Sequence, residues 1–166
     1  MTTHIFTWET ESATQAFAER LAQNPLIRTA NIQLSGDLGA GKSSFTRYLH
    51  RALGVVGTIK SPTYAVVEEY LVPNSKNGLS GFNDDLNIWH FDFYRFNDPA
   101  EWEDAGFKDI FLTEGLKISE WSEKAKGYVP TADLHIDIKI LDEDKRLVTV
   151  NAISDSGCKL VDTLQN

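Results

Sequence analysis

One segment of the sequence combines residue types and a spacing that suit the binding of phosphate. Residues 36–43 have the sequence Gly-Asp-Leu-Gly-Ala-Gly-Lys-Ser, which matches the P-loop pattern G-x-x-x-x-G-K-[ST]. The glycines let such a loop curl, so that the amides of residues 39–42 donate to phosphate oxygens at a helix N-terminus. Lys42 supplies a mobile charge for the β- and γ-phosphates, and the Ser43 hydroxyl can coordinate Mg²⁺. The segment predicts a site for a nucleoside triphosphate.

Two acidic residues compete for the next role that P-loop chemistry needs. P-loop chemistry needs a carboxylate at the C-terminal edge of a nearby strand, which holds magnesium or its water. Asp92 lies in residues 88–95, where apolar and polar side chains alternate, and Glu120 ends the short strand-like segment 116–120. The spacing does not choose between them, and we expect both near the nucleotide.

Four further residues are candidates whose roles the sequence leaves open. Ser61 and Thr63 follow the P-loop helix, where many nucleotide switches place a hydroxyl that senses the γ-phosphate, although a plain turn fits equally well. His90 is either a proton carrier or a histidine held by a neighbouring carboxylate. Arg95 pairs either with a phosphate or with Asp92.

The hydrophobic pattern predicts the elements that must position these residues. Strands are predicted over residues 5–8, 30–35, 65–71, 87–96, 116–120, 134–140 and 147–153. Helices are predicted from a capping box at Ser12 to Asn24, over 42–53, and from Asp98-Pro99 to Gly106, with a loop over 73–87. The alternation predicts one domain over residues 1–166. It is a three-layer, P-loop NTPase-like α/β fold, whose mixed sheet has a parallel core and an antiparallel C-terminal hairpin.

The composition limits the partners. The chain has 16 Lys and Arg against 24 Asp and Glu, a net charge of −8. Since non-specific nucleic-acid affinity comes mostly from clustered Lys and Arg, we expect no direct binding to DNA or tRNA. The single cysteine, Cys158, fits a reducing compartment, and the first eight residues do not resemble a leader peptide. Without an apolar run of 18 residues, we expect a cytoplasmic protein that does not contact a membrane.

The P-loop and three further motifs together resemble the TsaE family. The motifs are residues 36–43, 60–64, 90–95 and 120–121, and the resemblance covers residues 11–153. This family is the P-loop ATPase of the bacterial machinery that makes threonylcarbamoyladenosine in tRNAs reading ANN codons. The resemblance implies an ATP- and Mg²⁺-dependent accessory subunit. Such a subunit acts on a complex of the proteins TsaD and TsaB to support multiple turnovers, and meets tRNA only through them.

The resemblance also implies roles for individual residues. Ser43 and Glu120 bind Mg²⁺, and Asp92 acts on the attacking water or its metal. Residues 61–63 form a switch-like loop, and Trp121 either stacks beside the nucleotide or packs in the core. The implied nucleotide contacts are Glu11, Leu38, Gly39, Ala40, Gly41, Lys42, Ser43, Asp92 and Arg146. With Lys42, Asp92 and Glu120 as the catalytic group and no arginine finger in the motifs, hydrolysis by the isolated chain is expected to be slow.

The sequence departs from the family pattern at two places. Ser43 stands where the family more often has Thr, and either hydroxyl can bind Mg²⁺. The 73–87 loop is longer than is typical.

Two other functions use the same loop. A small-molecule kinase needs an arginine-rich lid, whereas the arginines here are scattered at positions 20, 28, 47, 51, 95 and 146. A nucleotide-gated binding module that rarely hydrolyses ATP needs the same pocket and is hardly separable by sequence.

Overall fold

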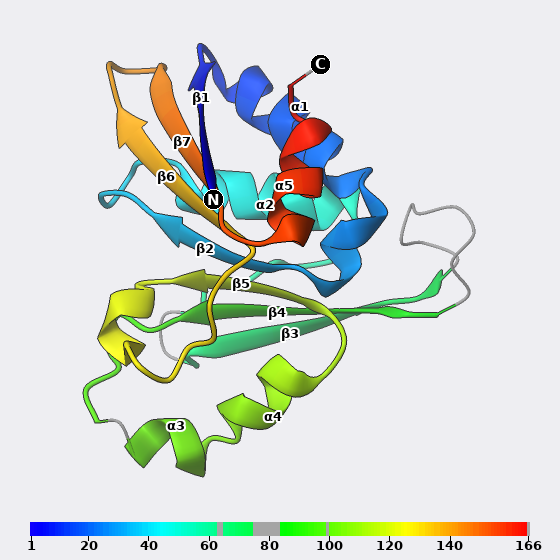
Figure 1. Cartoon of the computed structure of the whole chain (residues 1–166), viewed down its shortest axis with the longest axis vertical. Coiled ribbons are helices and arrows are strands. Elements are labelled where there is room, and N and C mark those ends of the chain that lie inside the picture. Colours follow the sequence, from blue (N-terminus) through cyan, green and yellow to red (C-terminus); the bar gives the residue numbers. More distant parts are fainter. Residues whose placement is uncertain (63–64, 75–83, 99, 166) are drawn as a thin grey trace.

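A seven-stranded mixed sheet organises the computed structural model, which describes residues 1–62, 65–74, 84–98 and 100–165. Its strand order is β1-β7-β6-β2-β5-β4-β3 (Figure 1). The strands are β1 (Thr2–Trp8), β2 (Asn31–Ser35), β3 (Val67–Val72), β4 (Leu86–Asp92), β5 (Leu116–Glu120), β6 (Leu134–Ile140) and β7 (Arg146–Ala152). Parallel pairs join β6, β2, β5 and β4, and antiparallel pairs add β3, β7 and β1. The predicted α/β class, with its parallel centre and β6-β7 hairpin, is confirmed.

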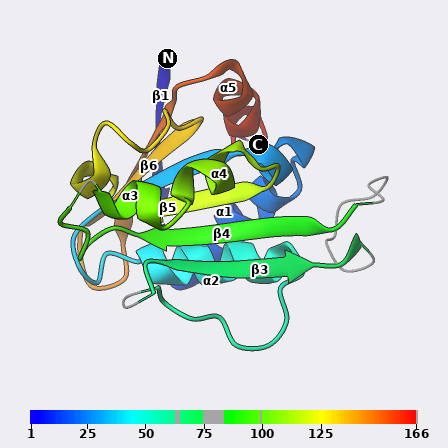
Figure 2. The same cartoon turned by 90° about the horizontal axis from the view of Figure 1, so that it is seen from below.

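Helices cover both faces of the sheet (Figures 1 and 2). The α-helices are α1 (Glu11–Ala22), α2 (Lys42–Ala52), α3 (Ala100–Asp104), α4 (Phe107–Leu112) and α5 (Asp155–Asp162), and the 3₁₀-helices include η1 (Pro25–Thr29) and η3 (Ser122–Ala125). On one face, α1, α2 and α5 bury a large core that includes Phe17, Phe45 and Leu160. On the other, α3 and α4 cover β4 and β5 through a smaller aromatic core around Phe91 and Trp102. None of the helices in the described ranges is long and apolar enough to cross a membrane.

The strand β4 stops earlier than the alternation of residues 87–96 predicts. It ends at Asp92, because the Asp92 carboxylate accepts a hydrogen bond from the Tyr94 amide at 3.0 Å and so turns the chain. Phe96 then donates to the Phe93 carbonyl at 2.9 Å and continues the turn. Aromatic residues continue past the end of the strand because Phe93 and Phe96 still pack into the smaller core.

Other boundaries also differ from the prediction. The capping box at Ser12 is wrong, because α1 already begins at Glu11 and the Thr10 carbonyl accepts from the Ala13 amide. The predicted cap at Asp98 is confirmed by its bond from the Ala100 amide at 2.9 Å, whereas Pro99 lies outside the described residues. Residues 75–83 of the expected loop also lie outside them, and its last two residues, 86 and 87, belong to β4. The helices α4 and α5 were not predicted.

Candidate functional site

The P-loop is the turn that connects β2 to α2, as its motif predicts. Gly39 and Gly41 adopt left-handed φ angles of 83° and 113°, which favour glycine although the space around both is open. Gly36 has a different constraint: a Cβ there would lie 2.4 Å from the Ile138 carbonyl oxygen of β6. The loop can therefore leave β2 this close to β6 only with glycine at its first position. Leu38 at its tip is 95% exposed.

The side chain of Lys42 is held inside this loop. Its Nζ donates to the Gly36 carbonyl at 2.5 Å and lies 5.0 Å from the centroid of the Trp121 ring. The Ala40 amide donates to the Asp37 carbonyl at 3.0 Å, so this N–H is used within the loop. The positive charge of Lys42 is therefore held inside the loop, where it attracts an anion that enters the loop.

The two competing acids lie side by side. Asp92 at the end of β4 and Glu120 at the end of β5 are direct partners in the parallel ladder. Glu120 in turn pairs with Leu34, at the end of β2 where the P-loop begins. Because the carboxyl ends of parallel strands share one edge of a sheet, the ladder brings both carboxylates to the P-loop. The structure thus brings both acids together at one site.

The environments of these two carboxylates differ. Glu120 is 6% exposed and pairs with His90 Nε2 at 2.7 Å. Asp92 is half-buried; burial raises its pKa, and the Glu120 charge raises it further, while the Tyr94 amide and the charges of His90 and Lys42 oppose the shift. Asp92 therefore binds a proton more strongly than an ordinary aspartate, a property that suits a group contacting a reacting water.

Trp121 joins the P-loop side of this arrangement. It follows Glu120 with a left-handed φ of 57°, which is unusual for a residue other than glycine. Its ring lies beneath the Lys42 ammonium and contacts Tyr94, with the ring centroids 5.0 Å apart. Trp121 also packs against the smaller aromatic core. Packing in the core is thus observed for the indole, and stacking beside a nucleotide stays a prediction.

A buried histidine behind the site was not predicted. His50 is fully buried on α2, and its Nδ1 donates to the Thr46 carbonyl at 2.7 Å. Its ring centroid lies 6.1 Å from that of His90 and 4.9 Å from that of Tyr70. The Tyr70 hydroxyl bonds to both the amide and the carbonyl of Lys60. A series of contacts thus runs from Glu120 through His90, His50 and Tyr70 to Lys60, which precedes Ser61.

A sequence signal for this histidine exists. Thr46 and His50 are spaced i and i+4, next to Phe45 and Leu49 of the apolar stripe, so they lie on the buried face of the helix. Polar residues on a buried helix face indicate a polar site in the interior.

One cavity joins the P-loop serine to the expected switch segment. Its volume is about 120 Å³, and it is lined by Ser43, Thr46, Arg47, Ile59, Lys60, Ser61 and His90. Ser61 therefore lies on the same cavity as Ser43, whereas Thr63 falls outside the described residues. Within the described ranges, no three His, Cys, Asp or Glu side chains form a ready-made metal cage. A hydroxyl such as that of Ser43 is an oxygen ligand that suits Mg²⁺, which in proteins usually keeps several waters and phosphate ligands.

The remaining candidates take different positions. Arg146 Nε donates to the Ala40 carbonyl at 2.9 Å, so it ties the start of β7 to the P-loop. Glu11, at the start of α1, accepts a bond from the Tyr48 hydroxyl of α2 at 2.9 Å. Arg95 is exposed in the turn after β4 and does not line the cavity beside Ser43.

Replacing His50 with Gln is expected to reduce the loss of stability in acid. Burial lowers the pKa of His50 from 6.5 to about 3, so the folded protein keeps this ring neutral while the unfolded chain protonates it. Its stabilising contribution is present above pH 6.5 and is lost as the pH falls towards 3. Between pH 7 and pH 4 the wild-type free energy of unfolding should therefore fall by about 3 kcal/mol more than that of His50→Gln.

Urea unfolding at several pH values tests this expectation. His135→Gln, which changes a partly exposed histidine of β6, serves as the matched control. Equal pH slopes for His50→Gln and the wild type would show that the buried ring does not govern acid stability.

The loop, the sheet order and the two strand-end carboxylates define a P-loop protein of the α/β class. The family model of the "Threonylcarbamoyl adenosine biosynthesis protein TsaE" matches residues 8–148. The chain belongs to the TsaE family, whose role is in the biosynthesis of threonylcarbamoyladenosine in tRNA.

Relatives with the same description cover most of the chain. The "tRNA threonylcarbamoyladenosine biosynthesis protein TsaE" of Haemophilus influenzae is 37% identical over 150 residues, which are 90% of this chain and 87% of the relative. The protein of the same name in Bacillus subtilis is 34% identical over 74% of this chain and 69% of its own. A crystal structure of Bacillus subtilis YdiB has the same fold, with a TM-score of 0.73, 24% identity, and coverage of 98% of this chain and 94% of that one.

Proposed function

We propose that this chain is an ATP-binding and ATP-hydrolysing accessory subunit in the cytoplasm that supports threonylcarbamoyladenosine formation. In this proposal it acts on the TsaB–TsaD complex, resets it between turnovers, and meets tRNA only through that complex. The observation that carries the hydrolytic part is the pairing of Asp92 with Glu120 beside the P-loop. The acidic composition supports the indirect contact with tRNA.

Each residue of the site has a role in the proposed hydrolysis. Lys42 and the loop amides other than that of Ala40, which bonds to the Asp37 carbonyl, bind the β- and γ-phosphates and stabilise the charge that develops on them. Ser43 and Glu120 hold Mg²⁺, which offsets charge on the phosphates when it is bound. Asp92 accepts a hydrogen bond from the attacking water and orients it, in keeping with its raised pKa.

His90 and Ser61 complete this arrangement. His90 Nε2 fixes one oxygen of Glu120 at 2.7 Å, which leaves the other oxygen for the metal side. Ser61, on the cavity that Ser43 lines, is in a position to respond to the γ-phosphate. Leu38, at the tip of the P-loop, contributes to nucleotide binding. Glu11 and Arg146 are assigned to the adenine end of the nucleotide. These two roles rest on the family resemblance, although Arg146 also contacts the P-loop carbonyl of Ala40.

A multiple-turnover assay tests the proposal. The chain is mixed with the TsaB–TsaD complex, tRNA, ATP and the threonylcarbamoyl donor, and phosphate release and modified tRNA are followed together. We expect slow phosphate release by the chain alone, an increase of at least about tenfold with the complex, and more than one modification per complex only when the chain and ATP are present. Modification that continues over many turnovers without the chain would contradict the proposal. Full-speed hydrolysis by the isolated chain would contradict its dependence on partners.

A further inference from the structure

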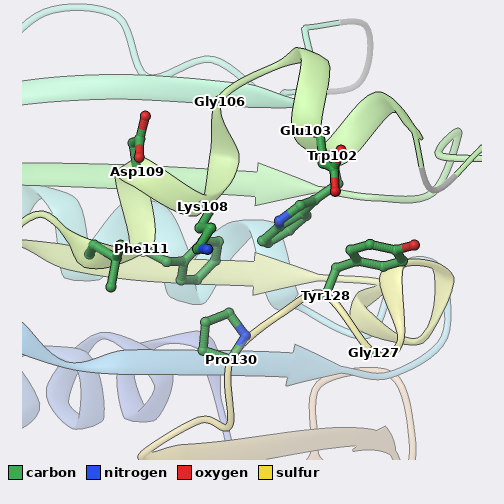
Figure 3. Close-up of a pocket in the computed structure, with 10 residues that line it drawn as sticks. Trp102, Glu103, Gly106, Lys108, Asp109, Phe111, Gly127, Tyr128 and Pro130 are labelled. Atoms are coloured by element: carbon green, nitrogen blue, oxygen red, sulfur yellow. The ribbon is translucent and has the colours of Figure 1, made fainter.

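A second cavity lies on the other face of the sheet, away from the P-loop helix α2. It has a volume of about 590 Å³, within the range of ligand-binding pockets. Its walls come from α3, α4 and the segment after η3, and its aromatic side chains are Trp102, Phe111 and Tyr128 (Figure 3). We refer to it as the aromatic groove. None of the roles assigned above to the P-loop and its carboxylates uses it.

The groove combines aromatic rings with acidic side chains. The Trp102 ring stacks on Phe111 with centroids 5.6 Å apart and lies 6.0 Å from Tyr128. Tyr128 is 39% exposed, so its ring is open to an incoming group. Glu103 and Asp109 line the same groove, with Lys108 as a basic neighbour. An aromatic face beside a carboxylate is the usual environment of a bound guanidinium group, which stacks on the ring and pairs with the acid.

The surroundings strengthen this charge preference. Residues 98–114 contain six Asp and Glu against one Lys. Such a surface repels nucleic acid and anionic lipid, and it attracts basic protein segments. Leu112, also in the lining, is 76% exposed and offers an apolar contact next to the acids. The lining of the groove therefore fits a polypeptide segment in which an arginine is adjacent to an aliphatic residue.

The groove is also connected to the P-loop. Trp121 touches the Lys42 ammonium and leads directly into η3, whose Ala125 is buried in the aromatic core that underlies the groove. The Tyr128 amide donates to the Ala125 carbonyl at 3.0 Å. A short, packed path thus joins the nucleotide side of the sheet to the groove.

We propose that the aromatic groove docks an arginine-bearing segment of the partner complex. The guanidinium stacks on Tyr128 and pairs with Glu103, and the neighbouring aliphatic side chain contacts Leu112. This inference rests on the proposed function for the identity of the partner complex and adds the surface and the chemistry of the contact.

Charge reversal within α3 tests the docking site. Glu103→Lys changes an acid that lines the groove, and Tyr128→Ala removes the exposed ring. Asp104→Lys makes the same change of charge on an exposed residue of α3 that does not line the groove, and so is the matched control. Affinity for the purified TsaB–TsaD complex is measured by calorimetry, at low and at physiological salt. ATP hydrolysis by the isolated chain is expected to stay unchanged in all three variants, and thermal unfolding shows that each variant folds, since the Tyr128 ring also packs beside Trp102.

We expect Glu103→Lys and Tyr128→Ala each to weaken the affinity at least about tenfold, and Asp104→Lys less than about threefold. The salt dependence should fall in Glu103→Lys. Wild-type affinity in both groove variants would overturn the docking site and leave the proposed function standing. An equal loss in Asp104→Lys would also overturn it, because net charge alone would then explain the effect. If the wild-type chain does not bind the complex at all, the docking site and the proposed partnership both fail.

Discussion

Lys42→Ala is expected to weaken ATP binding by about 100-fold while leaving the fold intact. The Lys42 ammonium is already held within the P-loop by the Gly36 carbonyl and is 8% exposed. Little side-chain freedom therefore remains to be lost when the phosphates bind, so that each charge-assisted bond contributes most of its free energy. Two such bonds at about 1.5 kcal/mol each correspond to about 100-fold in affinity.

Titration calorimetry with ATP and Mg²⁺ measures this loss. Lys159→Ala removes an exposed lysine of α5, away from the P-loop, and is the matched control. Circular dichroism and thermal unfolding show whether Lys42→Ala still folds, since its side chain also lies beside the Trp121 ring. Unchanged ATP affinity in a folded Lys42→Ala would refute the phosphate-binding role of the loop.

Asp92→Asn and Glu120→Gln are each expected to reduce partner-stimulated phosphate release by at least about 100-fold, with ATP affinity changed only a few-fold. Asn at position 92 retains an oxygen that can accept the Tyr94 amide bond, so the turn after β4 is preserved. Gln at position 120 retains an oxygen that can accept from His90 Nε2. Both variants remove the negative charge and keep the shape, and so they separate chemistry from folding.

Phosphate release and ATP affinity are measured on the same samples, with Glu123→Gln as control. Glu123 is an exposed acid of η3, three residues after Glu120. Because burial raises the pKa of Asp92, wild-type phosphate release should decline on acidification at a higher pH than an ordinary aspartate would give. Survival of stimulated release in both variants would remove the catalytic roles and favour the nucleotide-gated binding module.

The parts of the site that depend on neighbouring residues could be predicted from the sequence. The P-loop is a local pattern: its glycines, Lys42 and Ser43 lie within eight residues, and the strand before and the helix after follow from the hydrophobic period. The early end of β4 was not predicted, because the bond from the Tyr94 amide to the Asp92 side chain ends the strand although the alternation of apolar and polar residues continues. The helix α4 has six residues, too few for its period to stand out.

The pairing of Asp92 with Glu120 could not be predicted, because it depends on the register between two strands separated along the chain. The place of His50 behind the site was not predicted for a related reason. Its proximity to His90 arises when α2 packs on β4, and no spacing within either element specifies that contact. The local motifs therefore identify most residues of the site, and the register of the sheet determines which of them meet.

The position of β2 has a consequence for the synthesis of the protein. This strand carries the P-loop and ends at residue 35, yet both of its neighbours, β5 and β6, lie beyond residue 115. On the ribosome, the phosphate-binding segment therefore emerges long before the strands that flank it, and both edges of β2 stay open during that interval. The N-terminal strand β1 waits longer still, because its partner β7 ends at Ala152. We expect a nascent chain to complete the sheet only after Ala152 has emerged, whereas the Asp92–Glu120 pair beside the loop can form once Glu120 has emerged.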